Sequence, residues 1–109
     1  IHGEATSEKI ALGKSLDGRV SVVFGTHTHV PTADEEILPG KTAYITDIGM
    51  CGPSDSVLGV KTELSTSFMI THLRTGMEIA KGPCKVQGIF VETDDASGKA
   101  LSIERFDFR

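Results

Sequence analysis

Two histidines stand two residues apart directly after a short apolar run. His27 and His29 lie in Gly25-Thr26-His27-Thr28-His29, which follows the β-branched run at residues 20–24. That run predicts a buried strand, and the histidines fall in the loop after it. Because residues i and i+2 of extended backbone point the same way, roughly 6–7 Å apart, the two imidazoles could bind one metal ion or two adjacent ones. Imidazole suits zinc, iron and manganese. Taken alone, the pattern also fits loop histidines that are merely solvated or hydrogen-bonded.

Length and charge limit the classes of protein to consider. The chain has 109 residues, enough for one small domain, and a net charge of −4. This charge gives no basic field for long nucleic acid or an anionic membrane, although a bound metal would still allow a nucleotide substrate. No segment has the apolar length of a transmembrane helix, and the sequence does not start like a signal peptide. We therefore expect a cytoplasmic location.

Cys51 and Cys84 are the two cysteines. They are far apart and not in metal-type spacing, so they fit free thiols in a reducing compartment. Cys51 lies in a glycine-rich segment, residues 49–53, that we expect to be a loop. It could border a site, although a simple buried or loop thiol explains it as well.

The first half of the chain alternates helix and strand signals. A helix is expected to end near residue 17, with Thr6 or Ser7 as its cap and Ile10, Ala11 and Leu16 on its apolar face. The strand at residues 20–24 follows, and residues 42–47 predict a second one. The loops after these strands, residues 25–29 and 47–54, could edge one cleft. This order of elements predicts a layered α/β fold.

The second half predicts one more helix and then antiparallel strands. The helix begins near Thr62, its expected cap, and runs to Leu73, with His72 expected to meet the last carbonyls or solvent. Strands are expected at residues 78–80, 85–93 and 99–108, and residues 94–98 form the hairpin connection between the last two.

Three motifs together carry a family resemblance. They are His2-Gly3-Glu4-Ala5-Thr6-Ser7-Glu8-Lys9, Gly25-Thr26-His27-Thr28-His29-Val30 and Thr42-Ala43-Tyr44-Ile45-Thr46-Asp47-Ile48-Gly49-Met50. In this order and spacing the chain resembles the C-terminal half of the YmdB-like bacterial metallophosphoesterases, a branch of the calcineurin-like phosphoesterases. The resemblance covers most of the chain and weakens towards the hairpin. It implies a two-sheet β-sandwich flanked by helices, with two metal ions at the strand ends.

The resemblance also implies a chemistry and its residues. His2 and His27 would ligate one metal ion and His29 the other, the ions being divalent iron, manganese or zinc. The implied activity is hydrolysis of phosphodiesters such as 2′,3′-cyclic nucleotides, with two cations about 3.5–4 Å apart activating water and orienting the phosphate. Glu4 could hydrogen-bond a ligating histidine, or simply be solvated or cap a helix. Thr28 could touch phosphate or be a structural loop residue, and Asp47 is best explained as orienting a loop.

The sequence departs from the family pattern in what it lacks. Family members are more than twice as long, and their N-terminal half carries an early aspartate, a glutamate-asparagine pair with the bridging ligand, and an asparagine-histidine motif with the expected general acid. None of these motifs occurs here. We therefore expect residues 1–109 to be the C-terminal portion of a single metallophosphoesterase domain, without a catalytic residue of its own and inactive unless the N-terminal half is present. Gly3 and Ser54 also stand where alanine and an aromatic residue are expected.

Two other interpretations stay open. The chain could be a non-catalytic metal-binding or interaction module, or a structural domain whose histidines never bind metal. An incomplete domain also predicts unpaired surface at the strand of residues 20–24 and a free sheet edge at residues 42–46, and therefore a homo-oligomer or association with the missing half.

Overall fold

The computed structural model describes residues 1–74 and 76–109, which form two compact units. One unit comprises Ile1–Met50 and Gln87–Asp107, and the other comprises Cys51–Val86 and Phe108–Arg109. Within the described residues no helix has the length and apolar character needed to cross a bilayer. The helices and strands, in chain order, are α1 (Thr6–Leu16), β1 (Val22–Phe24), β2 (Glu36–Ile37), β3 (Ala43–Ile45), β4 (Cys51–Pro53), α2 (Thr62–Thr71), β5 (Cys84–Thr93) and β6 (Ala100–Phe108).

The first unit is built on the sheet β1-β3-β2. β1 runs parallel to β3, and β2 runs antiparallel to it. β3 is buried along its whole length. Val23, Leu38 and Tyr44 form the buried core, and Leu16 of α1 packs against it.

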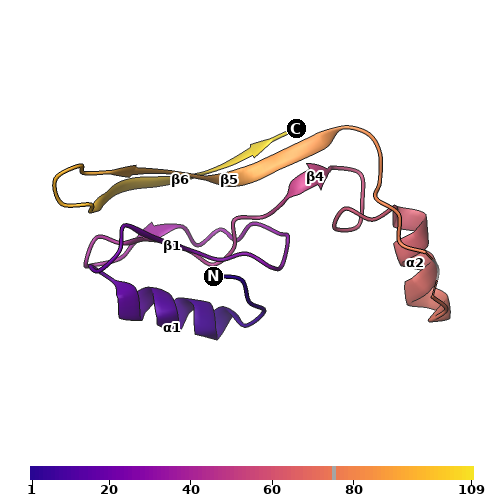
Figure 1. Cartoon of the computed structure of the whole chain (residues 1–109), viewed down its shortest axis with the longest axis horizontal. Helices are drawn as coiled ribbons and strands as arrows, with labels where there is room; N and C mark the ends of the chain where they lie inside the picture. The colour runs from indigo at the N-terminus through magenta and orange to yellow at the C-terminus, as the bar shows by residue number, and fades with distance from the viewer. Residues whose placement is uncertain (75) are drawn as a thin grey trace. The chain divides into compact units, whose positions relative to one another are not determined.

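Two further layers flank this sheet within the first unit. α1 lies on one side of it, and the β5–β6 hairpin runs along the other (Figure 1). The hairpin is tied to the sheet by a hydrogen bond from the Ala100 amide to the Lys41 carbonyl (2.8 Å) and by the Arg105–Glu35 ion pair (2.7 Å). The predicted mixed α/β fold is confirmed, with two three-stranded sheets and two helices in the described residues.

The second unit holds α2, the short strand β4 and the beginning of β5. β4 pairs antiparallel with β5, with Cys51 opposite Val86. α2 has no buried residue. The loop predicted at residues 49–53 was wrong, because its end forms β4, where Cys51 is exposed. The strand predicted at residues 78–80 was also wrong, since only Ile79 pairs there, bridging to Val60.

The helix starts differ from prediction. α1 follows Ala5 and α2 follows Lys61, and neither start has a side-chain cap. Thr6, Ser7 and Thr62 therefore lie inside the helices rather than at their caps. For α1 the reason is tertiary: residues 1–3 are hydrogen-bonded alongside residues 24–26, and this pairing fixes where the chain enters the helix.

The inward face of α1 is only partly the predicted apolar one: Leu16 packs on the core, but Ile10 and Ala11 are exposed. Its buried residues are Lys9 and Gly13, whereas Ile10 is 37% exposed. Gly13 is needed there because a Cβ would lie 2.5 Å from the Tyr44 ring. A small residue thus lets the helix lie directly on the aromatic side chain of β3.

Burial in the sheet also differs from prediction. Of the strand expected to be buried, only Val23 is buried, and Phe24 is 41% exposed. The reason is position: β1 is an edge of the described sheet, whereas β3 is its centre. The predicted free edge at residues 42–46 was therefore wrong, and the one predicted at residues 20–24 matches the position of β1.

Candidate metal centre

The loop of residues 25–29 is held tightly against the end of β3. The Gly25 amide donates to the Ile45 carbonyl (3.1 Å), and the Ile48 amide donates to the Gly25 carbonyl (3.0 Å). A Cβ on Gly25 would lie 1.7 Å from the Thr46 carbonyl oxygen, well inside any contact distance. Only glycine allows the two backbone segments to lie this close, so the end of β3 determines where the loop that carries the two histidines begins.

His2 reaches the same place from the other side of β1. The Thr26 amide donates to the Ile1 carbonyl (2.9 Å), and the Gly3 amide donates to the Thr26 carbonyl (3.3 Å). His2 bridges to Thr26 in parallel orientation. These bonds place two histidines that are 25 residues apart in sequence beside each other.

The rings of His2 and His27 face each other through nitrogen atoms. His2 Nε2 lies 3.0 Å from His27 Nδ1, and the ring centroids are 4.8 Å apart at 84°. Two lone pairs cannot face each other at this distance without a proton or a cation between them. Metal–nitrogen bonds of about 2.0–2.1 Å would allow both nitrogens to reach one ion.

The outer nitrogens of both rings are occupied. Glu4 Oε2 lies 2.9 Å from His27 Nε2, and Thr26 Oγ1 lies 3.1 Å from His2 Nδ1. A carboxylate only accepts hydrogen bonds, so it favours the proton on His27 Nε2 and leaves Nδ1 with its lone pair. This is the usual arrangement around a ligating histidine. The predicted contact between Glu4 and a histidine is present, and its role towards a metal stays a prediction.

His29 stands apart from this pair. Its Nδ1 is buried and has no hydrogen-bond partner among the described residues. Buried polar atoms are nearly always paired, so an unpaired imidazole nitrogen suits a ligand that the chain itself does not supply. Across residues 1–74 and 76–109, however, no three His, Cys, Asp or Glu side chains are grouped closely enough to hold a metal ion. The structure thus brings His2 and His27 together but not His29.

The backbone of the histidine loop is strained. His27 has φ 123° and His29 has φ 64°, values that L residues rarely adopt. Asp47 helps to hold the loop in this conformation, because its Oδ2 accepts a hydrogen bond from the Thr28 amide at 3.0 Å. The Thr28 hydroxyl turns back to the Val30 carbonyl (3.1 Å), which fits a structural role for this residue.

A buried ion pair supports the loop from beneath. Lys9 Nζ lies 3.3 Å from Asp47 Oδ2, with the two side chains 2% and 0% exposed. Lys9 also donates to the Thr26 carbonyl (3.1 Å), and Asp47 Oδ1 accepts the Gly49 amide (3.0 Å). Burial raises the pKa of Asp47, but the hydrogen bonds from Gly49, Thr28 and Lys9 together hold it below its ordinary value.

Sequence reasoning identified Asp47 as a loop-orienting residue and missed Lys9. One feature of the sequence could have indicated its burial. Lys9 lies one turn before Gly13, on the same face of a helix that has little amphipathic character.

Comparison with known proteins assigns this chain to a family. The family model described as "YmdB-like protein" matches residues 1–106. A Bacillus subtilis protein named 2′,3′-cyclic-nucleotide 2′-phosphodiesterase is 51% identical over 96% of this chain and 40% of its own length. A Mycoplasma pneumoniae protein named putative phosphatase/phosphodiesterase is 44% identical over 95% of this chain and 37% of its own length.

Solved structures agree with these sequence matches. A crystal structure described as a novel phosphatase from Mycoplasma pneumoniae superposes with a TM-score of 0.91 at 42% identity, over 98% of this chain and 38% of that one. A hypothetical protein from Thermus thermophilus superposes with a TM-score of 0.90 at 38% identity, over 98% of this chain and 42% of that one. The chain thus spans about two fifths of the length of the relatives it matches. On the extent of the family match and the identity to these relatives, the chain belongs to the YmdB-like protein family.

Proposed function

We propose that this chain supplies the histidine ligands of a dinuclear, metal-dependent phosphodiesterase. His2 and His27 hold one divalent ion, and His29 holds the second. The single observation that carries the proposal is the facing pair of ring nitrogens, His2 Nε2 and His27 Nδ1, 3.0 Å apart. The unpaired buried Nδ1 of His29 supports it independently.

The residues of the chain have distinct tasks in this proposal. Glu4 keeps the His27 proton on Nε2, so that Nδ1 is free to ligate. Asp47 and Lys9 fix the loop that carries His27 and His29. Bound iron, manganese or zinc ions would orient the phosphate group and offset the charge of the transition state.

Further groups must come from outside residues 1–109. Three histidines provide no bridging carboxylate, and the nearby Glu4 carboxylate contacts the outer nitrogen of His27 instead. In the described part of the chain no three His, Cys, Asp or Glu side chains are grouped to hold a metal ion. Thr28 and Glu4 remain candidates for contact with substrate or ligand, but they are not proton donors for a leaving group in this proposal. The chain alone is therefore inactive. Its activity depends on the part of the fold that its relatives carry beyond the matched region, or on another chain that supplies that part.

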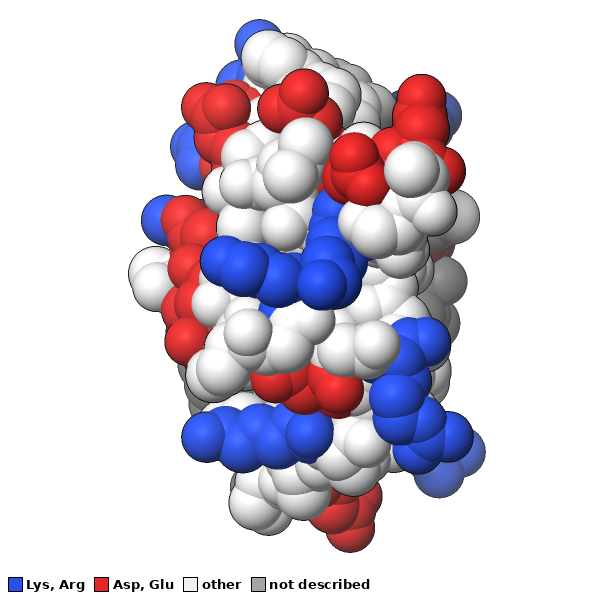
Figure 2. All heavy atoms as spheres, turned by 90° about the vertical axis from the view of Figure 1, so that its left-hand side faces the viewer, with Lys and Arg blue, Asp and Glu red and all other residues white. Residues whose placement is uncertain are grey.

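The substrate class in this proposal is a small phosphodiester, with 2′,3′-cyclic nucleotides first. The name of the Bacillus subtilis relative supports this choice. Long nucleic acid is disfavoured because the chain carries a net charge of −4, and Figure 2 shows acidic and basic side chains interspersed on the face it displays. A cytoplasmic location remains part of the proposal.

Elemental analysis of the purified chain tests the metal site. We expect iron, manganese or zinc to co-purify or to bind on addition, and we expect His27→Ala to lower the metal content. His72→Asn is the matched control, because it removes a histidine at the end of α2 and asparagine tolerates the left-handed backbone there (φ 56°). Absence of binding by all three metals, or equal loss in both variants, would contradict the site.

An activity assay then tests the dependence on outside groups. With manganese and 2′,3′-cyclic AMP, we expect this chain to show no turnover above buffer. Turnover by the chain alone, abolished by His27→Ala, would refute the claim that further groups are required.

A further inference from the structure

A polar pocket lies at the opposite end of the sheet β1-β3-β2 from the histidines. It has a volume of about 120 Å³ and lies entirely within the first unit. Ser21 directly precedes β1 and Lys41 lies two residues before the parallel strand β3, whereas the histidine loop and Asp47 follow those strands. Its lining residues include three basic side chains and no acidic one: Gly18, Arg19, Val20, Ser21, Gly40, Lys41, Ser97, Gly98 and Lys99.

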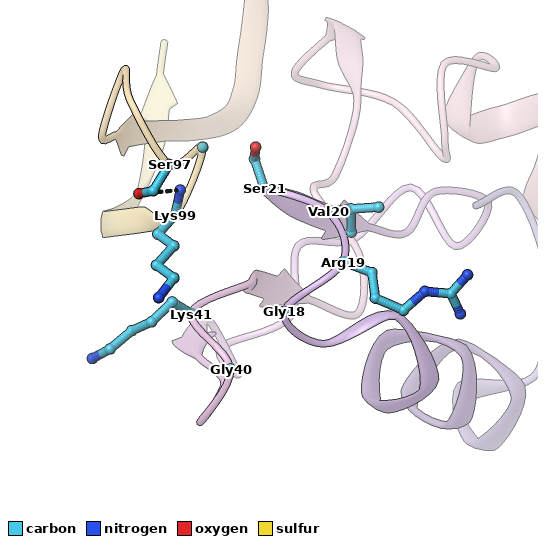
Figure 3. Close-up of a pocket in the computed structure, with 9 residues that line it drawn as sticks. Gly18, Arg19, Val20, Ser21, Gly40, Lys41, Ser97 and Lys99 are labelled. Atoms are coloured by element: carbon cyan, nitrogen blue, oxygen red, sulfur yellow. Dashed lines mark hydrogen bonds between the residues drawn. The ribbon is translucent and has the colours of Figure 1, made fainter.

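Lys41 occupies a backbone conformation that favours glycine or asparagine. Its φ is 75°, and it is held there by hydrogen bonds from its amide to the Leu38 carbonyl (2.8 Å) and from the Ala100 amide to its carbonyl (2.8 Å). A lysine in the left-handed region costs stability that a glycine would not. The presence of lysine at this backbone position therefore suggests a role for the Lys41 side chain. In Figure 3 the side chains of Lys41 and Lys99 extend towards the same region, and that of Arg19 points away from them.

The cations of the pocket are not neutralised by ion pairs. Among the described residues no carboxylate forms an ion pair with Arg19, Lys41 or Lys99, whereas Lys9, Lys61 and Arg105, which do form such pairs, lie outside the pocket. The Ser21 hydroxyl lies close to Gly98, where an added Cβ would be 3.4 Å from its oxygen, but in Figure 3 it points away from the two lysine side chains.

The carboxylates nearest the pocket are engaged elsewhere. Asp17 accepts the backbone amides of Gly40 (2.7 Å) and Thr42 (3.3 Å). Asp94 is within electrostatic range of Lys99, but its Oδ1 accepts the Ser97 amide at 2.7 Å. Within the described residues the pocket is therefore lined by unpaired basic side chains, although the chain as a whole is acidic.

We propose that this pocket binds a phosphate-type oxyanion, held by the Lys41 and Lys99 ammonium groups. Charge-assisted hydrogen bonds from lysine are a common means of binding phosphate. The ligand is either inorganic phosphate or the phosphate of a small monoester, which share this chemistry. The inference does not rest on the histidine site, because it uses different residues at the opposite end of β1 and β3.

Amide NMR of the ¹⁵N-labelled chain tests the proposal. The chain is titrated with sodium phosphate, at constant ionic strength and with a chelator present. We expect saturable shifts at the amides of Gly18, Gly40 and Gly98. Lys41→Asn, which suits the left-handed backbone, and Lys99→Gln should each weaken binding by about tenfold, the loss typical of one charge-assisted hydrogen bond.

Controls separate this pocket from other basic surface and from the histidines. Lys14→Gln changes an exposed lysine of α1, and both it and His27→Ala should leave the affinity unchanged. A parallel titration with glycerol phosphate distinguishes the sources, since tighter binding identifies a monoester and weaker binding identifies the free anion. Linear shifts without saturation, or the same affinity in Lys41→Asn and Lys99→Gln as in the unchanged chain, would overturn the proposal.

Discussion

Replacing Lys9 by methionine should destabilise the first unit strongly. The substitution keeps an apolar stem of similar length and removes an ammonium that lies 3.3 Å from Asp47 Oδ2 and 3.1 Å from the Thr26 carbonyl. Removing one partner of a buried pair costs about 3–5 kcal/mol. Asp47 would keep the amides of Thr28 and Gly49, so we expect the lower end, about 3 kcal/mol. For a domain of this size, that loss lowers Tm by roughly 10–20 °C.

The pH dependence of this loss has a definite sign. The folded-state pKa of Asp47 lies below its ordinary value, so its contribution to stability is present above the unfolded-state pKa and is lost as pH falls through the folded-state pKa. Without Lys9 the folded-state pKa rises. The difference between Lys9→Met and the unchanged chain should therefore be full above about pH 5 and shrink below about pH 4.

Urea denaturation followed by circular dichroism at about pH 7 and about pH 3.5 measures both effects. Lys14→Met, on the exposed surface of the same helix, is the matched control and should change the unfolding free energy by less than about 0.5 kcal/mol. A loss below about 1 kcal/mol for Lys9→Met at the higher pH, or a difference that does not shrink at the lower one, would refute the reasoning.

Two further substitutions test the packing of the first unit. Gly25→Ala places a methyl group 1.7 Å from the Thr46 carbonyl oxygen, and we expect a loss of about 3 kcal/mol or more in urea denaturation, with an unchanged midpoint as the contradicting result. Arg105→Gln removes the ion pair with Glu35, whose side chain is 23% exposed, and should cost less than about 1 kcal/mol. The hydrogen bond from Arg105 is the main cause of the lowered Glu35 pKa, so in Arg105→Gln that pKa should rise towards its ordinary value in an NMR titration. An unchanged Glu35 pKa would show that the ion pair does not stabilise the carboxylate.

The long elements of the fold could be predicted because their signals are local. β5 and β6 begin and end within one residue of the predicted strands, since a clear turn sequence at residues 94–98 separates them. β2 and β4 were missed because strands of two and three residues show no periodicity. The partner of β4 also lies about thirty residues later in the sequence, so nothing nearby indicates the pairing.

The site was predicted through its motifs rather than through residue spacing. His27 and His29 are separated by one residue, yet the structure pairs His27 with the distant His2, because the strained loop turns the two neighbours in different directions. Lys9 was missed because a lysine next to apolar residues is normally assigned to the solvent face. Its burial depends on Asp47, and that contact joins residues 38 positions apart.

Two carboxylates serve the histidine loop in opposite environments, and the contrast explains their separate roles. Asp47 is fully buried, accepts backbone amides from Thr28 and Gly49, and shares Lys9, so it is committed to holding the backbone. Glu4 has an 84% exposed side chain and contacts the outer nitrogen of His27. An exposed contact contributes little to folding but still fixes which nitrogen of the ring carries the proton. The loop is therefore positioned from the buried side, while the nitrogen of His27 that carries the proton is set from the solvent side.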